Sequence, residues 1–153
     1  MTIDDLKTLM DEFDPAALLP QIDTIVGKVE LAVRVAVMIG PIILLIMGLA
    51  YMFLSPKEAN YHFGYRCYFG MGSVNAWRYS QRLAGLIWAV LGLVLTGVML
   101  LQCSNFRGME IMDMLYTAAK CVLWQAGLLA AACLVINTLV MVSYDAKGER
   151  RRK

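Results

Sequence analysis

Residues 60–82 read NYHFGYRCYFGMGSVNAWRYSQR, the densest mixture of aromatic, glycine and arginine residues in the chain. Aromatic rings with one polar atom suit the headgroup layer of a membrane, and arginines can donate to lipid phosphates or to carboxylates. Glycines such as Gly64 permit turns that a Cβ would forbid, while Ser73 or Asn75 could cap a helix that follows. The stretch therefore predicts a structured interfacial loop that leads into a membrane helix.

The rest of the chain is apolar enough to supply the membrane part. Of its 153 residues, 59% are hydrophobic and 17% are charged, which is unlike an ordinary soluble domain. Residues 35–54, 83–101 and 122–142 contain no Asp, Glu, Lys or Arg. As helices, runs of this length cover about 30 Å, the thickness of the hydrocarbon core. We predict an all-α integral membrane protein with three transmembrane helices, because lipid cannot satisfy free backbone polar groups.

The charges orient these helices. Residues 1–34 carry seven acidic and three basic side chains, whereas residues 143–153 carry five basic and two acidic ones. Residues 55–82 carry four basic and one acidic, so the positive-inside rule places this loop and the tail in the cytoplasm. We expect an extracytoplasmic segment over 1–34, a membrane domain over 35–142 and a cytoplasmic tail over 143–153. The net charge of +2 gives no indication of a nucleic-acid partner.

The acidic segment contains its own helical pattern. In a helix over residues 2–13, the apolar residues would lie on one side and the acidic residues elsewhere, which is typical of an amphipathic helix. Pro15 and Pro20 should punctuate this segment. Anionic lipid would repel such a helix, so it is expected to pack on the protein or on a partner. Further on, Glu30 and Arg34 are spaced to pair across one helical turn.

Small residues recur at helical spacing in the second and third apolar runs. They are Gly85, Ala89, Gly92 and Thr96 in one run, and Ala126, Ala130, Cys133 and Asn137 in the other. Such stripes let helix backbones approach closely in lipid, although Gly and Ala are also simply common in membrane helices. Two matching stripes favour packing interfaces, within one chain or in a homo-oligomer. Gly40-Pro41 should kink the first helix, because proline removes a backbone donor.

The interfacial loop carries a family resemblance. The pattern Asn60-x-x-x-Gly64-Tyr65-Arg66, followed by Trp77 and Arg82 at the start of a membrane helix, resembles the signature of the SdpI family of bacterial membrane proteins. The resemblance covers residues 60–101, with Cys67-Tyr68 and Gln81 where the family commonly has Thr-Pro and His. It implies a bacterial plasma membrane location and immunity to a membrane-acting toxin peptide, or recruitment of a cytoplasmic regulator.

Each residue of this signature also has a plainer interpretation. Asn60 could satisfy backbone groups of a turn, and Trp77 is expected to anchor at the lipid headgroups. Arg66 could be buried against loop carbonyls or Asn60, or it could meet headgroups, which is the role expected for Arg78. In the third run, Gln125 and Asn137 are expected to form hydrogen bonds between helices rather than a proton relay.

The four cysteines form no Cys-x-x-Cys pair, which argues against a zinc site. Cys103 and Cys121 should both lie at the outer surface, where a disulfide is permitted. The alternative, that they are two small apolar residues, is favoured. No metal, cofactor or catalytic constellation is indicated, so an enzyme is not expected. Besides immunity, the sequence is compatible with an accessory subunit of a larger membrane complex, or with an oligomeric small transporter or lipid-handling protein.

The charge distribution makes a testable prediction about topology. A reporter that is active only in the cytoplasm should work when fused after Lys153 and should fail when fused ahead of Thr2. An active reporter at the N-terminal position would contradict the three-span arrangement or the charge argument behind it.

Overall fold

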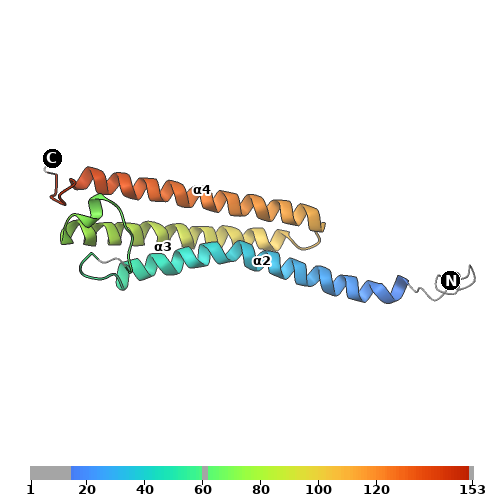
Figure 1. Cartoon of the computed structure of the whole chain (residues 1–153). Coiled ribbons are helices and arrows are strands. Elements are labelled where there is room, and N and C mark those ends of the chain that lie inside the picture. The colour runs from blue at the N-terminus through green and yellow to red at the C-terminus, as the bar shows by residue number, and fades with distance from the viewer. Residues whose placement is uncertain (1–14, 60–61, 152–153) are drawn as a thin grey trace, which may run out of the picture.

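The structure, a computed structural model, describes residues 15–59 and 62–151. Helices α2 (Pro15–Phe53), α3 (Val74–Asn105) and α4 (Ile111–Ser143) run side by side in an elongated bundle (Figure 1). A short 3-10 helix, η1 (Phe69–Met71), lies in the loop between α2 and α3. This loop lies at the same end of the bundle as the C-terminus, and the turn between α3 and α4 lies at the other end. All three helices are long and apolar enough to cross a membrane, which confirms the three predicted spans.

The helices extend beyond the apolar runs that predict them. Helix α2 begins at Pro15 and continues through Pro20, so Pro20 does not interrupt it. Pro15 suits the first position of the helix, where the missing N–H of a proline has no helical partner to lose. The predicted pairing of Glu30 with Arg34 is confirmed. The predicted amphipathic helix over 2–13 lies outside the described residues.

Helices α2 and α3 form the closest pair, because small residues face each other where they cross. A Cβ built on Gly48 of α2 would lie 2.7 Å from the Cα of Ala89. One built on Gly85 would lie 2.6 Å from Cγ of Met52, and one on Gly92 would lie 2.7 Å from the Cα of Leu45. Gly85, Ala89 and Gly92 of the stripe on α3 thus form a contact surface with α2 within the chain. Thr96, the fourth residue of the stripe, donates its hydroxyl to the carbonyl of Gly92 in its own helix.

Helix α4 packs through a face that coincides only in part with the stripe of small residues predicted on it. Its buried positions include Ala132, Ile136 and Val140, whereas Ala126 and Ala130 are exposed. The other two residues of the predicted stripe do make contacts within the chain, because Cys133 packs against the cluster that contains Tyr65 and Asn137 accepts from the Tyr65 hydroxyl. Ala126 and Ala130 share their surface with exposed leucines and valines, which face lipid in a membrane protein.

A polar contact holds α4 against the middle of α2. Pro41 has no N–H, so the carbonyl of Val37 one turn earlier loses its helical partner. Gln125 of α4 fills this vacancy, because its Nε2 donates to Val37 O at 3.1 Å. Gly40 makes room for the contact, since a Cβ there would lie 2.7 Å from Oε1 of Gln125. Helix α2 changes direction part-way along its length (Figure 1).

Two apolar clusters stabilise the two ends of the bundle. The cluster near the α3–α4 turn includes Val37, Phe106 and Met114, and it buries Cys103 with Cys121 packed against it. Both cysteines are free thiols, so the permitted disulfide is not formed in this structure. The second cluster lies at the end with the α2–α3 loop and is largely aromatic.

The contact between Gln125 and Val37 can be tested with a double-mutant cycle. Gln125→Leu should destabilise the protein by about 0.6 to 2 kcal/mol, because a carbonyl within the membrane loses its donor. In a Pro41→Ala background the cost should shrink, since the introduced alanine would supply a helical N–H to the same carbonyl. Unfolding in mixed micelles measures both values, and an equal cost in the two backgrounds would refute the assignment.

Candidate functional site

The candidate site is the folded loop, residues 62–73, together with the first turns of α3 and the C-terminal turn, residues 143–151. Its centre is Gln81, whose side chain is fully buried. Gln81 Oε1 accepts from the backbone N–H of Tyr65, and its Nε2 donates to the carbonyl of Tyr65, both at 2.7 Å. One carboxamide therefore satisfies both backbone groups of a loop residue that has no secondary-structure partner.

Gly64 allows the chain to reach this position. Its φ of +128° lies in a region that L side chains rarely adopt. A Cβ on Gly64 would also lie 2.6 Å from Cζ2 of Trp77. The structure corrects the expected role of Trp77, which is fully buried beneath the loop rather than anchored among headgroups. Its Nε1 donates to the carbonyl of Pro56 at 3.0 Å, which ties the start of the loop to α3.

Tyr65 connects the folded loop to α4. Its hydroxyl donates to Oδ1 of Asn137 at 3.0 Å and also lies 3.3 Å from the carbonyl of Cys133. Its ring packs edge-on against Trp88, with 5.6 Å between the ring centroids. Burial raises the pKa of the Tyr65 hydroxyl well above its usual value, so it remains a neutral donor. Asn137 thus bonds between segments, as expected for a polar residue in a membrane helix.

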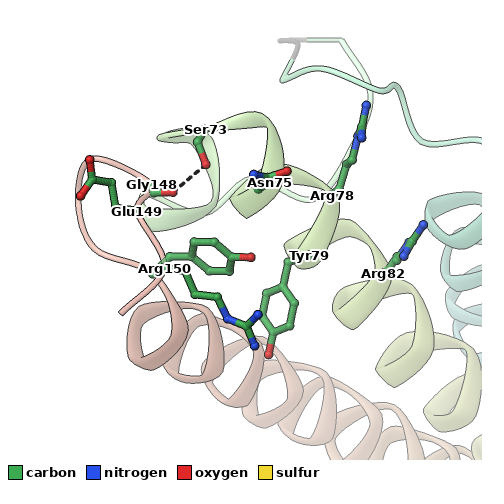
Figure 2. Close-up of a pocket in the computed structure, with 9 residues that line it drawn as sticks. Ser73, Asn75, Arg78, Tyr79, Arg82, Gly148, Glu149 and Arg150 are labelled. Carbon is green, nitrogen blue, oxygen red and sulfur yellow. Dashed lines mark hydrogen bonds between the residues drawn. The ribbon is translucent and has the colours of Figure 1, made fainter. Parts of the chain in front are cut away.

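The C-terminal turn docks on the start of α3. Ser73 caps this helix by accepting from the N–H of Ala76 at 3.2 Å, and its hydroxyl donates to the carbonyl of Gly148 at 2.7 Å (Figure 2). Gly148 approaches so closely that a Cβ on Gly72 would lie 2.6 Å from its nitrogen. Asp145 closes the turn by accepting from the N–H groups of Lys147 and Glu149. The tail is therefore a compact turn fixed to the loop, a feature that its charges alone do not predict.

Three arginines lie on the outside of this assembly: two from the signature, and Arg78, which is expected to meet headgroups. Arg66, Arg78 and Arg82 are all exposed. The interpretation in which Arg66 is buried against loop carbonyls is therefore wrong. Arg78 donates from Nε to the carbonyl of Lys57 at 3.3 Å. Figure 2 shows Arg78 and Arg82 pointing away from Arg150 and from the C-terminal turn. Asn60, the remaining signature residue, lies outside the described residues.

Three open pockets surround these side chains. The largest, about 670 Å³, lies between α3 and the C-terminal turn and is lined by residues that include Tyr79, Arg82, Tyr144, Glu149 and Arg150 (Figure 2). The other two, each about 430 Å³, lie beside Arg66 and beside Lys57. Over residues 15–59 and 62–151, no group of three or more His, Cys, Asp or Glu side chains could hold a metal ion. The site therefore offers cationic and aromatic binding surfaces.

A comparison with protein families matches residues 57–144 to the SdpI/YfhL protein family, which is more than half of the chain. The chain belongs to this family. Curated proteins and solved structures gave no match. The matched region contains the folded loop, α3 and α4, so the SdpI/YfhL assignment covers the hydrogen bonds of Gln81 and Tyr65 described above. Together with the three apolar helices, it identifies a membrane protein of this family.

The sequence singles out Gly64, Tyr65, Trp77 and Arg82, but it marks Gln81 only as a departure from the commoner His. A signal for Gln81 lies in the chemistry of the residue. A carboxamide can donate and accept at once, so it can replace a histidine that bridges backbone groups. A polar residue one position before Arg82, at the start of an apolar helix, is a candidate for such a bond.

The geometry at Gly64 predicts the effect of a substitution. Gly64→Val should destabilise the folded loop by about 1–3 kcal/mol, because the backbone conformation and Trp77 both oppose a side chain. Gly97→Val is the matched control, since nothing lies within 4 Å of a Cβ on Gly97. Trypsin cleavage after Arg66 in membranes measures loop opening. Faster cleavage is expected in the Gly64 variant alone, and equal rates in the two variants would show that Gly64 is not constrained.

Proposed function

We propose that the chain protects a bacterial plasma membrane against a membrane-acting toxin peptide, and that the folded loop is the part that meets the toxin. The proposal takes its function class from the SdpI/YfhL family. It places the N-terminus outside and the folded loop with the C-terminal turn in the cytoplasm, as the charge distribution favours. The observation that carries it is a groove of mixed polarity between the folded loop and α4.

This groove, here called the Arg66 groove, suits an amphiphilic peptide. It is lined by Arg66, Cys67, Tyr68, Phe69, Leu134, Asn137, Thr138 and Met141. Leu134 and Met141 are exposed on the lipid-facing side of α4, whereas Arg66 and Asn137 are polar. An inserted peptide could pack an apolar face on α4 and place a carboxylate or a backbone carbonyl beside Arg66, where a guanidinium forms strong charge-assisted bonds.

The way in which the groove is built supports its use as a binding site. Tyr65, directly before Arg66, is tied to Gln81 on one side and to Asn137 on the other. The backbone that carries Arg66 is therefore held in place before any ligand binds. Preorganisation of this kind reduces the entropic cost of binding.

A second candidate function is recruitment of a cytoplasmic regulator, which the pocket beside the C-terminal turn favours. This pocket of about 670 Å³ contains arginines and tyrosines, residue types that are enriched in protein interfaces. An accessory role in a larger membrane complex is the alternative class. The exposed surface around Ala126 and Ala130 would then meet a partner helix, and the chain would co-purify with one large partner at a fixed stoichiometry.

The immunity proposal predicts a specific loss of function. Arg66→Ala should reduce the tolerance that the wild-type chain confers on bacteria exposed to its toxin peptide. A reduction of about tenfold or more is expected, because a charge-assisted bond contributes roughly 1.5–3 kcal/mol. The protein level in membranes should be unchanged, since Arg66 is exposed and outside the spans.

Lys147→Ala is the matched control, because Lys147 is an exposed cation at the same end of the bundle. Growth across a toxin dilution series should separate the two variants. If Arg66→Ala retains as much tolerance as Lys147→Ala, Arg66 has no specific role and the Arg66 groove is not the toxin site.

A further inference from the structure

Arg78 and Arg82 lie one helical turn apart on α3, and they line both the pocket at the C-terminal turn and a second pocket at the end of α2. Figure 2 shows both guanidinium groups pointing away from Arg150 and from the C-terminal turn. Between them and the chain that leaves α2 lies an open pocket of about 430 Å³. Its lining residues are Met52, Ser55, Pro56, Lys57, Arg78 and Arg82. This pocket, here called the Lys57 pocket, contains three cationic side chains and no acidic one.

Two hydrogen bonds hold the walls of the Lys57 pocket together. Trp77 donates to the carbonyl of Pro56 at 3.0 Å, and Arg78 donates from Nε to the carbonyl of Lys57 at 3.3 Å. These contacts fix the turn after α2 against α3 and use only one of the N–H groups of Arg78. The remaining donors of its guanidinium are left for a ligand.

In the part of the chain that the structure describes, no carboxylate forms an ion pair with a cation of the Lys57 pocket. Within residues 24–59 and 62–151, the ion pair between Glu30 and Arg34 lies on α2, and neither Arg78 nor Arg82 has a carboxylate partner. Like charges held near each other without a counterion attract an anion. Arginine forks and a serine hydroxyl are the donors that proteins commonly use to bind a phosphate group.

The pocket also adjoins a lipid-facing apolar surface. Phe53 and Leu54, at the end of α2, are 75% and 72% exposed. Met52, which lines the pocket, is 37% exposed. A ligand that places a phosphate between the arginines could therefore lay an acyl chain along α2. The neighbouring pocket at the C-terminal turn shares Arg78 and Arg82 with the Lys57 pocket, but it also contains Glu149 and is lined largely by polar side chains.

We propose that the Lys57 pocket binds the phosphate group of an anionic amphiphile, and that in a membrane this ligand is an anionic phospholipid of the surrounding leaflet. The phosphate would accept from Arg78, Arg82 and Ser55, with Lys57 supplying further charge. A bound lipid would connect the end of α2 to the start of α3, beside the folded loop. This inference does not depend on the toxin proposal, because it concerns a different pocket.

Native mass spectrometry of the full chain in detergent tests the proposal. The probes are phosphatidylglycerol, which is anionic, and phosphatidylcholine, which is zwitterionic and has the same acyl chains. The wild type should retain one phosphatidylglycerol molecule in preference to phosphatidylcholine. Arg82→Gln should weaken this binding by about tenfold, the effect of losing one charge-assisted hydrogen bond, and Arg78→Gln/Arg82→Gln should weaken it further.

Arg150→Gln is the matched control, because it removes the same charge at the same end of the bundle without touching the Lys57 pocket. Equal retention of the two lipids by the wild type would overturn the proposal. Equal effects of Arg82→Gln and Arg150→Gln would also overturn it, since they would indicate a general surface attraction. An excess of inorganic phosphate distinguishes the sources: binding that survives it assigns the pocket to a lipid headgroup, and displacement overturns the lipid assignment in favour of a soluble phosphate.

Discussion

The pairing of the Gln81 carboxamide with both backbone groups of Tyr65 is the constraint on which the functional end of the molecule depends. A loop that packs at the membrane surface cannot leave its buried N–H and C=O groups without partners, because an unsatisfied group there costs several kcal/mol. Gln81 comes from α3, an element that is already fixed by its pairing with α2. The loop therefore takes its position from a rigid helix.

The other features of the site follow from this pairing. With Tyr65 fixed, the preceding residue must turn beside Trp77, which only a glycine can do at a φ of +128°. The Tyr65 ring is directed into the bundle and reaches Asn137 of α4. Arg66, the next residue, is left on the surface at the edge of the groove. Because Gln81 fixes the backbone of Tyr65, the side chain of Tyr65 points into the bundle and the side chain of Arg66 lies on the surface.

Polar contacts also explain how α4 joins a bundle that is dominated by α2 and α3. Lipid tails are as apolar as leucine, so the burial of apolar side chains does not by itself drive a membrane helix to associate with its neighbours. Helix α4 instead forms hydrogen bonds along its length, which include those between Gln125 and Val37 in the middle of α2 and between Asn137 and Tyr65 near the loop. The packing faces of α4 lie along this line of contacts, whereas Ala126 and Ala130 remain exposed.

The sequence predicts the local features well and the long-range ones poorly. The apolar runs, the pairing of Glu30 with Arg34 and the capping role of Ser73 depend on neighbouring residues, and the structure contains all of them. The face that α4 presents depends on which carbonyl Pro41 frees in another helix, which spacing cannot reveal. The expectation for Trp77 is wrong for a similar reason, because an aromatic residue near a span suits headgroups and a buried loop equally well.

Hydrogen exchange at the amide of Tyr65 tests the central claim most directly. In a loop without regular structure an amide normally exchanges quickly, but this one donates to a fully buried side chain. In full-length protein in lipid nanodiscs, the Tyr65 amide should exchange as slowly as the amides of α3 and far faster after Gln81→Leu. Rapid exchange in the wild type would contradict the account, because the loop would then not be held by Gln81.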